Sequence, residues 1–277
     1  IILGVAGKMG PTLARLARRA LEEAGNHARV FGVSRFSSPG LRASLEAAGI
    51  QMVSCDLLDR QAVAQLPDAP HVIFMAGRKF GSTGNEPLTW AMNTYVPAII
   101  AERYRTSRIV AFSTGNVYDL VPLSSGGATE ATPPHPIGDY AQSCLGRERI
   151  LTYFSQQYGT PMTIMRLNYA VELRYGVLLD VAQQVYAGTV IDLSMGNANV
   201  IWQGDANRYA LHCLDLAASP PTILNVTGPE IVSIRAVVHR FGELFGVEPR
   251  LEGEEAPTAF LSNASRSYHL FGYPRIP

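Results

Sequence analysis

The first ten residues, IILGVAGKMG, decide the fold. The apolar run at 1–5 is typical of a buried strand, and a GxxGxxG pattern begins inside it. Residues 11–24 then repeat apolar side chains at helical spacing, with Pro11 in the first turn. A strand, a glycine loop and a helix in this order predict a pyrophosphate site at the helix N-terminus, although a plain tight turn is the alternative. The loop residues expected at the cofactor are Gly4, Gly7, Lys8, Met9 and Gly10.

Strand and helix signals alternate along the rest of the 277 residues. This order predicts an α/β fold, a Rossmann-type doubly wound parallel sheet with a smaller C-terminal substrate lobe. Strands are expected at 28–33, 51–55, 71–75, 109–113, 162–167 and 222–226, and helices at 41–48, 88–104, 140–158, 175–187, 205–217 and 234–245. We expect residues 1–167 to form the NAD(P)-binding domain, with returning segments at about 199–227. Residues 168–198 and 228–277 are expected to form the smaller lobe.

Composition limits the classes of function. Basic and acidic residues balance at 23 each and are scattered, so no nucleic-acid partner is expected. Three cysteines without CxxC or Cys/His spacing predict neither a disulfide framework nor a metal site. The sequence has no run of 18 apolar residues, so no membrane span is expected. The chain opens on an expected strand rather than a signal peptide. A cytoplasmic protein with a small-molecule substrate is the expectation.

Two further strand ends fit a dinucleotide site. Asp56 and Leu57 follow the third strand, where an acidic side chain lies near an adenine. Ala76 and Gly77 follow the fourth strand, where small residues allow the backbone to pass close to a ribose. An alternative for the acidic residues is capping of the helix that follows, and Asp59 fits that role well.

The end of the second strand bears on the choice of cofactor. An acidic residue there binds the ribose 2′-hydroxyl of NAD, whereas an arginine accommodates the 2′-phosphate of NADP. The chain has Ser34 and Arg35 at this point and no carboxylate, and Lys8 adds a second positive charge. The sequence therefore favours NADP over NAD. The alternative is that Arg35 is a solvated loop residue.

With these motifs, the chain resembles the extended short-chain dehydrogenase/reductase family, in its NAD-dependent epimerase/dehydratase group. The resemblance spans essentially the whole chain, including Asn93, the segment STGNVY at 113–118 and the segment RLN at 166–168. It implies that Lys79 and Asn93 lie at the cofactor. It also implies that Thr114 orients a substrate oxygen, while Tyr140 exchanges a proton with that oxygen and contacts the cofactor. A homodimer formed through helices 88–104 and 140–158 is implied as well.

One position departs from the family. Cys144 stands where the family's Tyr-x-x-x-Lys motif has its lysine, and neither lysine of the chain lies four residues after a tyrosine. A phenol with an ordinary pKa near 10 is a poor base at neutral pH unless a cation lowers that value. Lys79 is a candidate substitute for the missing cation. Cys144 is either a small residue on the helix face or, with help from Arg147, a reactive thiol.

Three residues are candidates for the substrate side, each with a plainer alternative. His135 is an acid/base candidate or a surface residue, Asn168 contacts substrate or caps a turn, and Arg174 binds an anionic group or is solvated. The sequence favours an NAD(P)-dependent oxidoreductase or epimerase/dehydratase acting on a sugar-like or hydroxy-acid substrate, with an altered proton path. The alternative is a catalytically weak or inactive cofactor-binding sensor or structural protein.

Overall fold

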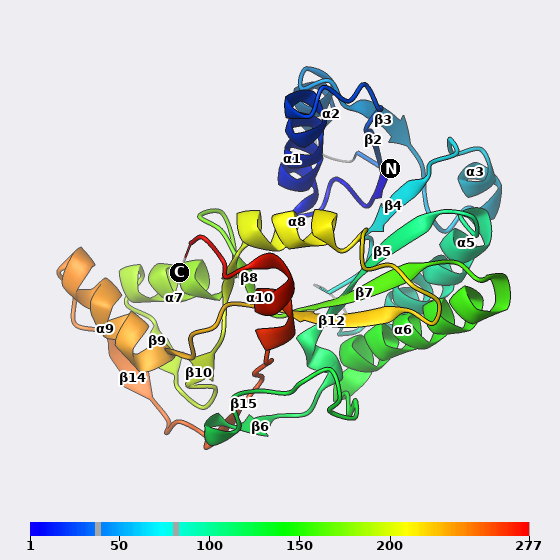
Figure 1. Ribbon diagram of the computed structural model, residues 1–277. Helices are drawn as coiled ribbons and strands as arrows, with labels where there is room; N and C mark the ends of the chain where they lie inside the picture. The colour runs from blue at the N-terminus through cyan, green and yellow to red at the C-terminus, as the bar shows by residue number, and fades with distance from the viewer. Residues whose placement is uncertain (37–39, 80–82, 277) are drawn as a thin grey trace. The chain divides into compact units, whose positions relative to one another are not determined.

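The computed structural model describes residues 1–36, 40–79 and 83–276 (Figure 1). Its contacts divide the chain into two compact units. Unit 1 comprises residues 1–117, 136–166 and 207–223, and unit 2 comprises residues 118–135, 167–206 and 224–277. The domain bounds expected from the sequence stay a prediction.

The described residues form a seven-stranded central sheet with the order β12-β7-β5-β4-β1-β2-β3 (Figure 1). Its strands are β1 (Ile2–Leu3), β2 (Phe31–Ser34), β3 (Gln51–Ser54), β4 (His71–Phe74), β5 (Arg108–Thr114), β7 (Met162–Leu167) and β12 (Thr222–Val226). In the middle of the sheet, Leu3 pairs in parallel with Val33 on one side and with Phe74 on the other. All three are fully buried, as expected for parallel strands covered on both faces. The predicted doubly wound Rossmann-type sheet is confirmed.

The helices of unit 1 cover this sheet. They are α1 (Gly10–Glu23), α2 (Leu41–Glu46), α3 (Arg60–Ala64), α4 (Glu86–Trp90), α5 (Val96–Arg103) and α6 (Gly138–Tyr158). Helix α1 contacts α2, whereas α3, α5 and α6 pack against one another in sequence. Asp59 caps α3, because its side chain accepts hydrogen bonds from the N–H groups of Gln61 and Ala62. The capping alternative for Asp59 is therefore confirmed.

The single helix expected over residues 88–104 is wrong in one respect. A π-helical turn, Ala91–Tyr95, separates α4 from α5. Pro97 lacks an N–H, so the carbonyl of Asn93 loses the donor that an α-helix would place four residues later. Such π turns are rare and often lie at functional sites. This break places the buried Asn93 side chain within a widened turn.

Unit 2 is built from short elements. They are β6 (Val121–Pro122), β8 (Ala170–Val171), α7 (Val177–Tyr186), β9 (Val190–Asp192), β10 (Asn197–Ala198), β11 (Ile201–Trp202), β13 (Val232–Ser233), α9 (Ile234–Phe245), β14 (Arg250–Glu252), β15 (Thr258–Ala259) and α10 (Ser265–Phe271). Helices α7 and α9 pack around an apolar cluster that includes Val185 and Val238. Within the described residues, no helix combines the length and apolar character needed to cross a membrane.

Helix α8 (Gln203–His212) begins two residues before the predicted start and ends before Ala217. Its first residues belong to unit 2 and its last residues to unit 1. Asp205 lies in the first turn, where its carboxylate accepts hydrogen bonds from the backbone N–H groups of Arg275 and Ile276. The helix predicted over 205–217 therefore differs from α8 at both ends.

Candidate functional site

The glycine loop has the geometry that a dinucleotide requires. Gly4 has a φ of +90°, and a Cβ atom there would lie 2.7 Å from the Cα of Ala76. A Cβ atom on Gly10 would overlap the carbonyl of Val5, so this glycine lets α1 approach β1. Gly7 is exposed, and a Cβ atom there would meet just one atom, 3.4 Å away. The first turn of α1 also has no side-chain cap, so the residues present fit a phosphate group.

The other loop residues differ in exposure. Lys8 is exposed, whereas Met9 is buried and its carbonyl lies 3.4 Å from Nδ2 of Asn207 on α8. Asn207 is fully buried, and its Oδ1 has no hydrogen-bond partner among the described residues. Burying an amide oxygen without a hydrogen-bond partner costs stability, and Asn207 does so next to the glycine loop. Sequence reasoning missed Asn207, because its partner lies 198 residues away.

Arg35 and Asp56 come together at the ends of β2 and β3. Nη1 of Arg35 lies 3.8 Å from Oδ2 of Asp56, and the Arg35 side chain is 71% exposed. The other carboxylate oxygen of Asp56 accepts a hydrogen bond from the N–H of Leu58. Ser34, at the end of β2, is half-buried, and Leu57 belongs to the core. Asp56 therefore orients a guanidinium that remains open to an anion.

Asn93 connects three segments at the carboxyl end of β4. Its Oδ1 accepts from the N–H of Arg78 at 2.8 Å, and its Nδ2 donates to the carbonyl of Arg78 at 3.0 Å. Nδ2 also donates to Oγ of Ser143 on α6 at 3.0 Å. This amide fixes the Ala76–Gly77 turn against α6. Lys79, the next residue along, is exposed.

Tyr140 and Thr114 meet in unit 1. The hydroxyl of Tyr140 forms side-chain hydrogen bonds with Thr114 and Cys144. Burial raises the pKa of Tyr140 well above its ordinary value, and Cys144 adds to this rise; Arg147 and the Thr114 hydrogen bond act in the opposite direction. The phenol is therefore a proton donor at neutral pH. The Thr114 hydroxyl is fixed by Asn116, whose side-chain oxygen lies 3.0 Å away.

Cys144 is a buried thiol. Burial raises its pKa, although the positive charge of Arg147 acts in the opposite direction. A reactive cysteine requires a lowered pKa and access to solvent. The structure therefore favours the role of a small helix residue over that of a nucleophile. Its Sγ lies 3.9 Å from Nδ2 of Asn93.

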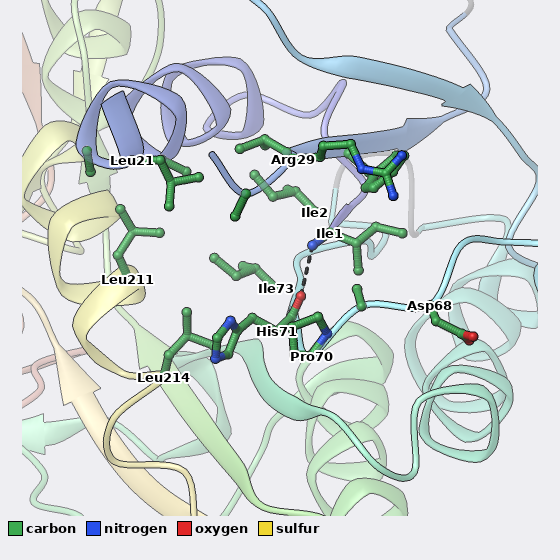
Figure 2. A pocket seen from close by; sticks show the side chains of 16 residues that line it. Ile1, Ile2, Leu21, Arg29, Asp68, Pro70, His71, Ile73, Leu211 and Leu214 are labelled. Atoms are coloured by element: carbon green, nitrogen blue, oxygen red, sulfur yellow. Dashed lines mark hydrogen bonds between the residues drawn. The ribbon is translucent and has the colours of Figure 1, made fainter. Parts of the chain in front are cut away.

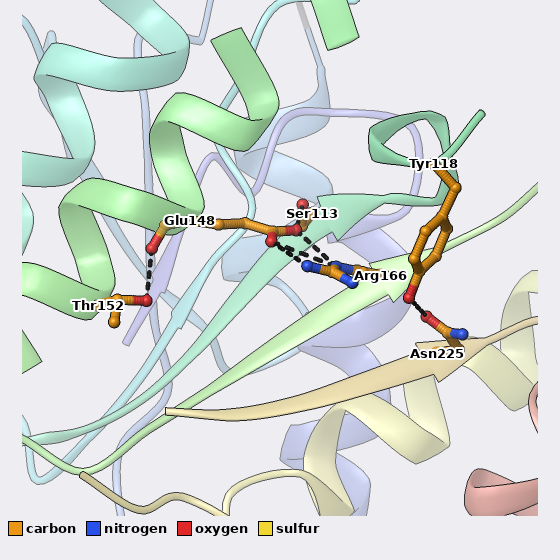
Figure 3. Close-up of polar contacts among 6 residues, drawn as sticks. All are labelled: Ser113, Tyr118, Glu148, Thr152, Arg166 and Asn225. Atoms are coloured by element: carbon orange, nitrogen blue, oxygen red, sulfur yellow. Dashed lines mark hydrogen bonds and ion pairs between the residues drawn. The ribbon is translucent and has the colours of Figure 1, made fainter. Parts of the chain in front are cut away.

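Figure 3 shows a buried ion pair and a serine that contacts it; Glu148 and Ser113 are the sequence neighbours of Arg147 and Thr114. Glu148 on α6 pairs with Arg166 on β7, with 2.6 Å between Oε2 and Nη2. Ser113 on β5 donates to the other carboxylate oxygen at 2.5 Å. Three elements of unit 1 are joined in this way. In unit 2, separately, Tyr118 donates to Asn225 at 2.8 Å.

The three substrate candidates all belong to unit 2. Nδ1 of His135 lies 2.8 Å from Oδ2 of Asp119, and Nε of Arg174 donates to Glu172 at 2.8 Å. Both candidate side chains are largely exposed. Asn168 is buried, and its Nδ2 donates two hydrogen bonds within the unit, which gives it a structural role. Their contacts with substrate stay predictions.

A pocket of about 440 Å³ lies elsewhere in unit 1 (Figure 2). It is lined largely by apolar side chains, among them Ile1, Leu21, Leu211 and Leu214. Ile1 and His71 place it at the amino ends of β1 and β4. Ligands of open α/β sheets bind at the carboxyl ends, where the glycine loop lies. This pocket is therefore separate from the predicted cofactor site.

Comparisons with known proteins agree with this fold. A model of the NAD dependent epimerase/dehydratase family matches residues 1–234. No curated protein sequence matches the chain significantly.

Two solved structures with NAD show the same fold across the whole chain. The dTDP-glucose 4,6-dehydratase of Streptomyces venezuelae, with NAD and TYD bound, is 18% identical, has a TM-score of 0.83 and is covered over 92% of its own length. The UDP-glucose 4-epimerase of Thermus thermophilus is 20% identical, with a TM-score of 0.79 and 94% of its length covered. The chain therefore belongs to the NAD dependent epimerase/dehydratase family.

Proposed function

We propose that this protein is a nicotinamide-dependent oxidoreductase of the epimerase/dehydratase type, acting at a hydroxyl or carbonyl carbon of a sugar-like or hydroxy-acid substrate. The observation that carries the proposal is the hydrogen bond between Tyr140 and Thr114. When bound, the nicotinamide supplies the hydride acceptor or donor. Thr114 orients the reacting oxygen, and Tyr140 holds the proton that this oxygen receives or loses.

The residues that would hold the cofactor follow the carboxyl ends of the strands. They are Gly4, Gly7, Lys8, Met9 and Gly10 at the phosphates; Ser34, Arg35, Asp56 and Leu57 at the adenosine; and Ala76, Gly77, Lys79, Asn93 and Tyr140 toward the nicotinamide ribose. The uncapped N-terminus of α1 supports the phosphate assignment. The exposed guanidinium of Arg35 supports a preference for NADP, because it suits a 2′-phosphate.

The raised pKa of Tyr140 supports one direction of reaction. A phenol that keeps its proton gives it readily to a carbonyl oxygen during reduction. Removing a proton from an alcohol requires the phenolate, which is scarce at neutral pH. We therefore propose that carbonyl reduction is faster than alcohol oxidation near pH 7.

The substrate class is proposed from relatives of the same fold. Solved members include a UDP-glucose 4-epimerase and a UDP-glucuronic acid 4-epimerase, the latter from Bacillus cereus. Sugar nucleotides are therefore the first substrates to test, followed by smaller hydroxy acids and their keto forms. His135, Asn168 and Arg174 remain candidates for contact with them.

A second candidate function rests on Cys144. A neutral, buried thiol replaces the cation of the family motif, so a cofactor-binding protein with little turnover is the alternative. The Tyr140–Thr114 contact favours the enzyme, because cofactor binding alone does not require an oriented phenol.

We also propose a homodimer formed through the helices at 86–103 and through α6. Aromatic side chains exposed on these helices support it, since Tyr95 is 51% and Tyr153 is 58% exposed. Sedimentation at micromolar concentration tests the assembly. A monomer throughout this range would contradict it.

The function is tested by titrating the protein with NADPH and NADH, followed by turnover with UDP- and dTDP-sugars and keto acids. Tyr140→Phe should lose about 10²- to 10⁴-fold in turnover. Its cofactor affinity should fall much less, because Tyr140 is one of several residues proposed at the nicotinamide ribose. Tyr186→Phe, at an exposed position on α7, is the control. Binding without turnover on any substrate would favour the second candidate, and absence of binding would refute both.

A further inference from the structure

Arg147 is a buried cation beside the proposed catalytic tyrosine. It lies on α6 one turn after Cys144, and the residue is 6% exposed. Nη1 donates to the carbonyl of Phe112 at 2.6 Å, and the guanidinium lies over the ring of Phe74. Nη2 and Nε donate to the side chain and the main chain of Asn93. The Arg147 side chain is thus held in one position by Phe112, Phe74 and Asn93.

Three separate segments of the chain surround the Arg147 guanidinium. The π turn that accompanies Pro97 leaves the carbonyl of Asn93 to accept from Nε, at 3.3 Å. At the end of β4, Gly77 leaves room for Nη2, which a Cβ atom there would overlap. The end of β5 supplies the carbonyl of Phe112. A positively charged side chain at position 147 is therefore held in one place.

The acceptors of Arg147 are neutral. Within the described residues, its hydrogen bonds reach carbonyl and amide oxygens, and no carboxylate pairs with it. The neighbouring Glu148 is occupied by Arg166 and Ser113. Burying a cation without an ionic partner is costly. The positive charge of Arg147 therefore remains uncompensated in the part of the chain that the structure describes.

The groups around the phenol indicate where this charge acts. Tyr140, Cys144 and Arg147 follow one another on α6 at intervals of four and three residues, so they share one face of the helix. The Asn93 amide that accepts from Arg147 also lies 3.9 Å from the Cys144 thiol, and the Tyr140 hydroxyl hydrogen-bonds that thiol and Thr114. Of these, Arg147 is the cation, and it lowers the pKa of both Tyr140 and Cys144. Lys79 is exposed, whereas Arg147 is buried one turn from Cys144 on the same helix. Arg147 is therefore a better substitute for the missing lysine than Lys79.

We infer that Arg147 supplies, from one turn further along α6, the positive charge that the family's lysine supplies elsewhere, and that it stabilises the phenolate form of Tyr140. This inference rests on the proposed function. When Tyr140 gives its proton to a substrate oxygen, the negative charge left on the phenol oxygen is stabilised by the guanidinium. Cys144 remains a neutral thiol in this arrangement. Arg147 acts through Tyr140 and is a positioning residue.

The test measures the phenol directly. A difluorotyrosine placed at position 140 titrates at a lower pH than tyrosine, and ¹⁹F NMR follows it without substrate or cofactor. Arg147→Gln should raise the pKa of this phenol by about one unit, a tenfold gain in proton affinity. Arg147→Lys keeps the positive charge, so the pKa of the phenol should rise much less in this variant. Adding Cys144→Lys to Arg147→Gln should also lower the value again.

An unchanged phenol pKa in folded Arg147→Gln would overturn the inference. If that variant does not fold, Gly77→Ala decides, because it displaces the guanidinium and keeps its charge. A phenol pKa unchanged in Gly77→Ala would likewise overturn the inference. Since no cofactor is used, this result is independent of NADPH or NADH binding, which tests the proposed function.

Discussion

Arg147 and Asn93 are joined twice, by a 2.9 Å hydrogen bond from Nη2 to the side-chain oxygen and a 3.3 Å hydrogen bond from Nε to the main-chain carbonyl. The same side-chain oxygen accepts from the N–H of Arg78. A single amide therefore connects the turn after β4, the π turn and α6. Disturbing any of these three segments should change the geometry of the proposed cofactor site at the carboxyl ends of the strands.

Gly77→Ala tests this connection. The added methyl group overlaps Nη2 of Arg147, so we expect a loss of about 1 to 3 kcal/mol in the free energy of unfolding and weaker cofactor binding. In an Arg147→Ala background the overlap is gone, so Gly77→Ala should lower the free energy of unfolding by less. Denaturant unfolding of the four proteins measures the coupling. Strictly additive losses would show that the two residues do not interact.

Glu148→Gln should be strongly destabilising, because it removes the carboxylate that forms the buried ion pair with Arg166. Breaking a buried pair costs about 3 to 5 kcal/mol. The matched control is Glu46→Gln, which breaks the exposed pair with Arg42 and should cost at most about 0.5 kcal/mol. Urea unfolding at pH 7 measures both. Equal losses in the two variants would contradict the structural role of Glu148.

Arg35→Gln should weaken NADPH binding about tenfold or more and change NADH binding little, because only NADPH carries a 2′-phosphate for this charge to bind. Its control is Arg42→Gln, at an exposed position on α2. Fluorescence titration with both cofactors gives the ratio of dissociation constants. If Arg35→Gln changes both affinities equally, Arg35 does not select the cofactor.

Stability should fall at alkaline pH through Tyr104. Burial raises the pKa of Tyr104 from 10.0 to about 12, so the unfolded chain loses this proton first. The resulting stabilisation is complete below pH 10 and is lost as the pH rises toward 12. Tyr104→Phe should reduce the slope of unfolding free energy against pH in this window. Tyr186→Phe, at a largely exposed position, should leave the slope unchanged.

Local signals were enough for much of the fold. The glycine loop, the parallel strands and the Asp59 cap depend on residues close in sequence, and each was predicted from its neighbours. The contacts of Arg147 with Asn93 span 54 residues, so helical periodicity did not reveal them. Pro97 was the available signal, because a proline inside an expected helix removes a donor. The pairing of Arg35 with Asp56 was missed because it requires two strand ends to meet.

The π turn also has a consequence for rotation about the helix axis. Each residue turns an α-helix by about 100°, and a π turn holds about one residue more than an α turn. The side chains after residue 95 are therefore out of phase with those before it. This offset lets Asn93 face α6 while Ile99 and Ile100 pack in the core of the sheet. Shortening the segment 91–95 by one residue should rotate these faces apart even if every polar group were retained.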